Sequence, residues 1–153
     1  MQNAKITIIQ PFIPNYREDF YKKLSFEMPF DLLTVEKPLS NLSFKLSKKV
    51  KSKNIKILKL GSIIIFNPFN YYIIKNKTIV IQWNPKWFSL FILLIVKPVL
   101  KKKIILWTHG VSVRNGFSYD RIKDKIKLFF FNLSDGLLFY TENELNIMSP
   151  FLK

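Results

Sequence analysis

The sequence contains no cysteine and a single histidine, His109. The absence of cysteine excludes disulfides, cysteine-ligated zinc and a thiol nucleophile, and it fits a reducing compartment. One histidine cannot form a zinc site of several imidazoles. We therefore expect no metal site of these kinds.

Glycine is also scarce, with four residues in 153. The sequence has neither a G-x-G-x-x-G fingerprint nor a P-loop, which argues against a flavodoxin-like or nucleotide-binding protein and against a bound cofactor. Its longest apolar run, residues 87–96, is shorter than the about 20 residues of a membrane-spanning helix. No signal peptide is visible before the first strand-like run. We expect a cytoplasmic protein, either soluble or peripheral at the inner membrane face.

Acidic residues are few, and the formal net charge is +15. A basic surface attracts nucleic acid, anionic lipid or phosphorylated substrates, although the excess of lysine over arginine also suits an AT-rich genome. Nucleic acid is not an expected partner, because no basic recognition helix, RNA-binding aromatic motif or helix-turn-helix signal is visible. The lysines at 101–103, near Trp87, Phe88 and Phe91, leave two interpretations open. They contact an anionic membrane surface, or they form a solvated turn.

Short apolar runs alternate with helical patterns along the whole chain. Most of the runs are continuous, which is typical of parallel strands buried on both faces. The expected strands are residues 5–9, 30–35, 55–60, 78–82, 104–107 and 137–140. Residues 69–74 fit a helix or a further strand, and part of 36–54 fits a helix. The pattern predicts an α/β fold, a single Rossmann-like three-layer domain over residues 1–153 with a mostly parallel sheet.

Polar residues that can cap helices follow several of these strands. We predict capping boxes at Asn15 with Glu18 and at Thr141 with Glu144. Asn84 is expected to cap a helix over 85–96, and Ser118 to cap the helix before 134–136. The predicted buried faces are Tyr16, Phe20 and Leu24 on the first helix, and Ile122, Ile126, Phe129, Phe130 and Leu133 on the later one, with Lys123 and Lys127 outside.

His109 is the candidate catalytic residue. It follows the strand 104–107 and precedes Gly110, at the carboxyl edge of a parallel sheet where ligands bind. An imidazole changes its protonation near neutral pH, so it can take a proton from a substrate hydroxyl or hydrogen-bond to it. The alternative is a histidine that satisfies a loop carbonyl. Gly110 permits close approach of a substrate or closes a plain turn.

Other residues at this edge are candidates for substrate binding. Arg114 contacts a phosphate or sugar hydroxyl, or is a solvated loop arginine. The three residues at the start of the first helix favour anions or only cap the helix. These three residues are Asn15, Tyr16 and Arg17. Three more candidates are Asn84, Thr141 and Glu142. The alternative role of Asn84 and Thr141 is a helix cap, and that of Glu142 is an exposed acid.

Four segments together resemble the N-terminal domain of bacterial glycosyltransferases of the GT-B fold, family 4-like. They are residues 8–17 (IIQPFIPNYR), 82–87 (QWNPKW), 106–110 (LWTHG) and 138–142 (LFYTE). The resemblance covers nearly the whole chain. It implies one half of a GT-B fold, which binds the sugar acceptor and faces a second Rossmann-like domain that binds the nucleotide sugar.

The resemblance also implies a function in surface polysaccharide synthesis. A sugar would pass from a nucleotide-sugar donor to a glycan or lipid-linked acceptor, with His109 facing the cleft between the domains. The sequence has no counterpart of the donor-site glutamates, so we expect the donor-binding domain to be missing and this chain alone to be inactive. The alternative is a basic Rossmann-like binding module without catalysis, whose partner is anionic lipid, nucleic acid or a protein.

Overall fold

The computed structural model describes residues 6–35, 50–110 and 121–152. Within these ranges six strands form one sheet in which every pairing is parallel. The strands are β1 (Ile6–Gln10), β2 (Phe30–Thr34), β3 (Lys53–Asn54), β6 (Thr78–Gln82), β7 (Lys103–Thr108) and β8 (Gly136–Phe139). The predicted α/β class and parallel sheet are confirmed.

The strand order is β3-β2-β1-β6-β7-β8. The chain starts in the middle of the sheet, builds one half outward, and then returns beside β1 to build the other half. The order therefore reverses between β1 and β6, and ligand sites of such sheets lie at the carboxyl ends of the strands near this reversal. Because all six strands are parallel, Gln10, Gln82, Thr108 and Phe139 end at the same edge.

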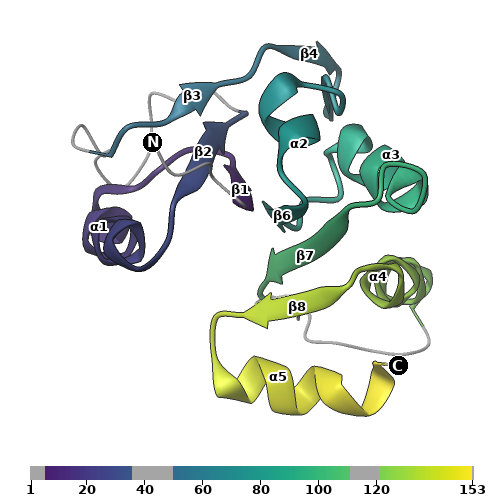
Figure 1. Cartoon of the computed structure of the whole chain (residues 1–153). Coiled ribbons are helices and arrows are strands. Elements are labelled where there is room, and N and C mark those ends of the chain that lie inside the picture. The colour runs from purple at the N-terminus through teal and green to yellow at the C-terminus, as the bar shows by residue number, and fades with distance from the viewer. Residues whose placement is uncertain (1–5, 36–49, 111–120, 153) are drawn as a thin grey trace.

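Helices cover both faces of the sheet, which gives three layers (Figure 1). Helix α1 (Glu18–Glu27) packs on one face, where Tyr21 joins Ile8, Leu32 and Val80 in a small apolar cluster. The larger cluster on the other face contains side chains of three helices that follow β5, β6 and β7. These helices are α2 (Tyr71–Lys75), α3 (Phe88–Val96) and α4 (Ile122–Leu133). Helix α5 (Glu142–Met148) follows β8 and adds the buried Met148 to the larger cluster.

Two further strands form a separate antiparallel hairpin, β4 (Ile57–Leu60) and β5 (Ile63–Phe66). The predicted strand at 55–60 thus exists, but it pairs with the apolar run after it rather than with the main sheet. Residues 69–74 resolve as helical, because α2 begins at Tyr71 and the Asn70 side chain accepts a hydrogen bond from the Tyr72 N–H. The predicted helix within 36–49 lies outside the described residues.

Two predicted helix starts are wrong, one falls outside the described residues, and the fourth is confirmed. Asn15 opens a short 3-10 helix, Asn15–Arg17, and α1 follows without a side-chain cap. Asn84 accepts from the Lys86 N–H and closes a turn, so α3 begins later, at Phe88. Arg121 occupies the N-cap position of α4, and Ser118 lies outside the described residues. At α5 both hydrogen bonds of the predicted Thr141 capping box are present.

The predicted buried faces of two helices are confirmed only in part: Leu24 and Phe130 pack partly buried against the core, but several other predicted positions are exposed. In α1 the first turn is displaced by the 3-10 helix, so Tyr21 is buried while Tyr16 and Phe20 are exposed. In α4 the buried positions are Asp124, Leu128 and Phe131, and the predicted positions Ile122, Ile126 and Phe129 are exposed. The sequence pattern places Asp124 on the surface because aspartate is charged. In the structure Asp124 is buried with its ion-pair partners, so the buried face of α4 differs from the one that the apolar residues predict.

Candidate functional site

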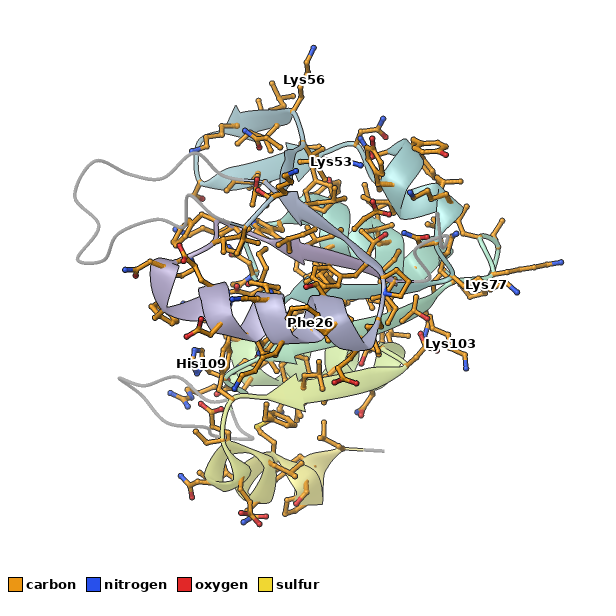
Figure 2. All side chains as sticks on the ribbon, turned by 60° about the vertical axis from the view of Figure 1, so that its left-hand side comes forward. Phe26, Lys53, Lys56, Lys77, Lys103 and His109 are labelled. Carbon is orange, nitrogen blue, oxygen red and sulfur yellow. The ribbon has the colours of Figure 1, made fainter. Side chains whose placement is uncertain are left out.

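Three rings are stacked at the carboxyl edge of the sheet, and we call them the aromatic column. Tyr140, directly after β8, stacks on His109 with centroids 4.0 Å apart and planes at 16°. Its other neighbour is Trp107 of β7, at 5.5 Å and 30°. Figure 2 labels His109 near the arrowhead of β8. The column forms because β7 and β8 are neighbours in register, so residues just beyond their ends meet.

His109 is oriented by a carboxylate from the next helix. Its Nδ1 lies 2.9 Å from Oε1 of Glu144. An ionised carboxylate only accepts hydrogen bonds, so the neutral imidazole carries its proton on Nδ1 and leaves Nε2 as the acceptor nitrogen. The Glu144 side chain is 13% exposed and that of His109 is 57% exposed. A fixed carboxylate thus holds an imidazole that solutes can reach.

Glu144 is itself held by the capping box of α5. Its Oε2 accepts from the backbone N–H groups of Tyr140 at 3.1 Å and Thr141 at 3.2 Å. The Thr141 hydroxyl accepts in return from the Glu144 N–H at 3.2 Å. One carboxylate oxygen therefore fixes the start of the helix, and the other fixes the histidine.

The backbone turns sharply after His109. Gly110 has a φ of +70°, which favours glycine, and its N–H donates to the Thr108 hydroxyl at 2.9 Å. A Cβ at position 110 would lie 2.7 Å from Cε1 of Phe139 and 2.9 Å from Cγ of Met148. Glycine is required here both by conformation and by space.

Lys127 of α4 holds this turn in place by a hydrogen bond to its backbone. Its Nζ donates to the Gly110 carbonyl at 2.9 Å and lies 3.0 Å from Oδ1 of Asp124. Arg121 pairs with the other oxygen of Asp124 at 2.9 Å. The Lys127 side chain is largely buried, so the prediction that it lies outside the core is wrong, whereas Lys123 is exposed as predicted.

Arg17 ties the first strand to the aromatic column. Its guanidinium donates to Oε1 of Gln10, the last residue of β1, at 2.8 Å and to the Tyr140 hydroxyl at 2.9 Å. It also lies over the ring of Trp107, 4.9 Å from the centroid. Burial raises the pKa of the Tyr140 hydroxyl, with Arg17 opposing the rise. Burial likewise raises the pKa of Tyr21 to about 12, again against the charge of Arg17.

Two hollows open beside the aromatic column, and all three of its rings line both. One, of about 190 Å³, is completed by Gln82, Trp83, Thr108, Gly110 and Lys127. The other, of about 230 Å³, is completed by Tyr16, Arg17 and Phe20. The lining of the first includes the polar side chains of Gln82, Thr108 and Lys127, and the second is lined mainly by aromatic rings. This arrangement can hold a polar ring compound on either side of the imidazole.

The structure brings together part of the predicted site. His109, Gly110, Tyr16 and Arg17 line these hollows, whereas Asn15 and Asn84 line neither. The two residues after β8 were predicted as a cap and an exposed acid or as part of the cleft wall. Thr141 is the cap and Glu142 is exposed in the first turn of α5. Arg114 lies outside the described residues.

Sequence reasoning did not assign site roles to Glu144, Lys127, Trp107 and Tyr140. Glu144 was visible only as the third residue of a capping box, and that pattern carries no information about its second oxygen. Trp107 and Tyr140 were visible as the residues that end two neighbouring strands. Lys127 was hidden by the shifted pattern of α4.

Among the described residues no three His, Asp or Glu side chains gather in a way that could hold a metal ion. In the same ranges none of the helices is long and apolar enough to cross a membrane. The sequence matches no model of a known protein family, and no curated protein matches it.

Proposed function

We propose that this chain is the acceptor-binding domain of a glycosyltransferase, one half of a GT-B fold, that acts in the synthesis of a surface glycan. One observation carries the proposal: His109 lies at the carboxyl edge of a Rossmann-like sheet with Nδ1 held by Glu144 at 2.9 Å. A carboxylate that orients an imidazole in this way prepares its other nitrogen to take a proton from a hydroxyl. The resemblance of the strand-end segments to family 4-like glycosyltransferases supports the same assignment.

In the proposed reaction an acceptor hydroxyl lies at Nε2 of His109. The hydroxyl oxygen bonds to the anomeric carbon of a nucleotide sugar as the bond from that carbon to the phosphate oxygen breaks. The proton passes to Nε2, and the nucleoside diphosphate leaves. Glu144 stabilises the imidazolium that forms, because its carboxylate already accepts from Nδ1. The donor would be bound by a second domain, in the same chain or in a partner.

The hollow beside Tyr16 suits the acceptor sugar. Its walls are Tyr16, Phe20, Trp107 and Tyr140, and Arg17 lies between them. The C–H face of a sugar ring packs on aromatic rings, while its hydroxyls need polar partners such as the guanidinium. Its volume of about 230 Å³ suits one sugar ring of a longer glycan. We therefore propose that the acceptor binds here with one hydroxyl directed to His109.

Activity with a donor-binding domain present is the first test. The full chain, or this domain with its donor-binding partner, should transfer sugar from a UDP- or GDP-sugar to an acceptor glycan. His109→Ala should lower kcat by about 10²- to 10⁴-fold, the usual contribution of a general base. Asn15→Ala is the matched control, since Asn15 is exposed at the same edge and lines neither hollow. Full activity of a folded His109→Ala protein would refute the role of the imidazole.

The single histidine allows a second test on the isolated chain. In NMR spectra the ring signals of His109 have no overlap from other histidines. We expect the Nδ1–H tautomer to dominate in the neutral ring, and the signals to shift when a glycan acceptor is added. In Glu144→Gln the tautomer population should move toward Nε2–H. A neutral ring that is mainly Nε2–H in the unmodified protein would contradict the proposed orientation.

A further inference from the structure

The β4–β5 hairpin stands apart from the main sheet, at the end of the molecule opposite α5 (Figure 1). Residues Leu60 and Ile63 pair across a loop of two residues. The first of these, Gly61, has a φ of +59°, and a Cβ added to it would meet no atom within 4 Å. Gly61 therefore faces open space, and residues 61–63 at the tip are all exposed.

Both faces of this hairpin are mostly apolar, with Lys59 as the one charged residue of the two strands. Residues that face each other across antiparallel strands lie on the same side. Ile57 with Phe66 and Lys59 with Ile64 lie on the inner side, where Ile64 and Phe66 are buried in the core.

The outer side is formed by the pairs Leu58–Ile65 and Leu60–Ile63. Leu58 and Leu60 are each 57% exposed, and Ile63 is 45% exposed. A soluble hairpin with a core-facing side normally places polar residues on the other side, so this apolar outer face calls for a partner.

Two exposed lysines lie at the edges of this face: Lys56 comes just before β4, and Lys59 lies between Leu58 and Leu60 with its side chain on the inner side. Figure 2 shows the side chain of Lys56 extending away from the body of the protein. Within the described residues neither Lys56 nor Lys59 makes a salt bridge, whereas Lys53 pairs with Asp31 at 3.6 Å. The hairpin thus presents apolar side chains at an exposed tip, together with two lysines that form no salt bridge with the part of the chain that the structure describes.

We propose that the β4–β5 hairpin inserts its tip into an anionic membrane surface. Charge complementarity identifies the occupant: lysines beside the apolar face attract anionic headgroups, while the net charge of +15 opposes pairing with a second copy of this chain. Shape favours the same partner, because a protruding tip enters the headgroup layer, whereas a partner protein would need a matching groove. This proposal does not depend on the glycosyltransferase assignment, and it locates the contact away from residues 101–103. Trp87, named with those lysines, is fully buried.

Vesicle binding tests the proposal directly. The unmodified chain should co-sediment with vesicles of phosphatidylglycerol and phosphatidylcholine in equal parts and not with phosphatidylcholine alone, and added salt should weaken the binding. Leu58→Ser combined with Leu60→Ser should reduce binding at least about tenfold. The matched control is Ile122→Ser with Ile126→Ser on α4, which also removes two exposed aliphatic side chains and should bind as the unmodified chain does.

The absence of cysteine permits a probe at the tip. An environment-sensitive fluorophore on Ser62→Cys should shift to shorter wavelength with anionic vesicles, whereas the same label on Ser25→Cys of α1 should not. Equal binding by the hairpin variant and the unmodified chain, or equal shifts of the two labels, would overturn the proposal. The proposal would also be overturned if the unmodified chain did not bind vesicles but sedimented as a dimer, and if the hairpin variant alone were a monomer. That result would assign the face to a second copy of the chain.

Discussion

Replacing Gly110 with alanine should destabilise the protein through two separable effects. The φ of +70° costs an alanine about 1 to 2 kcal/mol. The new Cβ would also lie 2.7 Å from the ring of Phe139 and 2.9 Å from Cγ of Met148. Forcing an atom into such a packed site costs about 1 to 3 kcal/mol more. We therefore expect Gly110→Ala to lower the free energy of unfolding by about 2 to 5 kcal/mol, or Tm by about 5 to 15 °C.

Gly61 provides the matched control. Its φ of +59° is nearly the same, but a Cβ there would meet nothing within 4 Å. Gly61→Ala should therefore show only the backbone cost of about 1 to 2 kcal/mol. Urea unfolding followed by far-UV circular dichroism measures both variants. If Gly110→Ala loses no more stability than Gly61→Ala, the packing of Phe139 and Met148 against this turn does not constrain position 110.

Two further predictions concern charged side chains. Burial acts to raise the pKa of Asp31, but hydrogen bonds from Lys75 and Asn76 outweigh it and hold the pKa below its usual value. The ionised Asp31 therefore stabilises the fold fully above its unfolded-state pKa of about 4, and this stabilisation is lost as pH falls through the lower folded-state pKa. In urea unfolding at a series of pH values, the free energy of unfolding should decline less steeply with acid in Asp31→Asn than in the unmodified protein. Lys127→Met should lower the free energy of unfolding by about 2 to 3 kcal/mol, because it removes the ammonium from one oxygen of the buried Asp124 carboxylate and from the Gly110 carbonyl, while Arg121 still pairs with the other carboxylate oxygen. Lys123→Met on the exposed side of α4 should be near neutral in the same measurement.

Five of the six strands of the sheet could be predicted from sequence because they are continuous apolar runs, whereas β3 (Lys53–Asn54) has no apolar residue and was not predicted. Such runs indicate burial on both faces, and this property depends little on tertiary detail. The β4–β5 hairpin was harder to place. Residues 55–60 alternate in hydrophobicity as a strand does, but only the register with Ile63–Phe66 shows that the hairpin leaves the main sheet. Pairing partners are decided by the whole chain, and a local pattern does not contain them.

Helix starts and buried faces failed where a single polar side chain changes the pattern. Asn84 has the side chain and the following proline of a helix cap, and it uses the same oxygen to close a turn. Asp124 reads as a surface residue, and it is buried because Arg121 and Lys127 neutralise it. In both cases the residue type was read correctly, and the partner that decides its position was not in the local sequence.

The same limit explains which part of the candidate site was found. His109 could be selected from the sequence because it follows a parallel strand, whose end lies at the ligand edge, and because an imidazole can take up a proton near neutral pH. Its partner was not found, because the Thr141–Glu144 capping box accounts for Glu144 completely as a structural residue. The capping box uses only Oε2, and Oε1 remains for His109.

A glutamine at position 144 has one oxygen for these two tasks. If that oxygen keeps the cap, the amide nitrogen faces Nδ1, which must then accept a hydrogen bond, so the proton moves to Nε2 and the ring can no longer take one from a hydroxyl. The identity of residue 144 as an acid, rather than only as a helix-capping side chain, is therefore what the proposed chemistry requires.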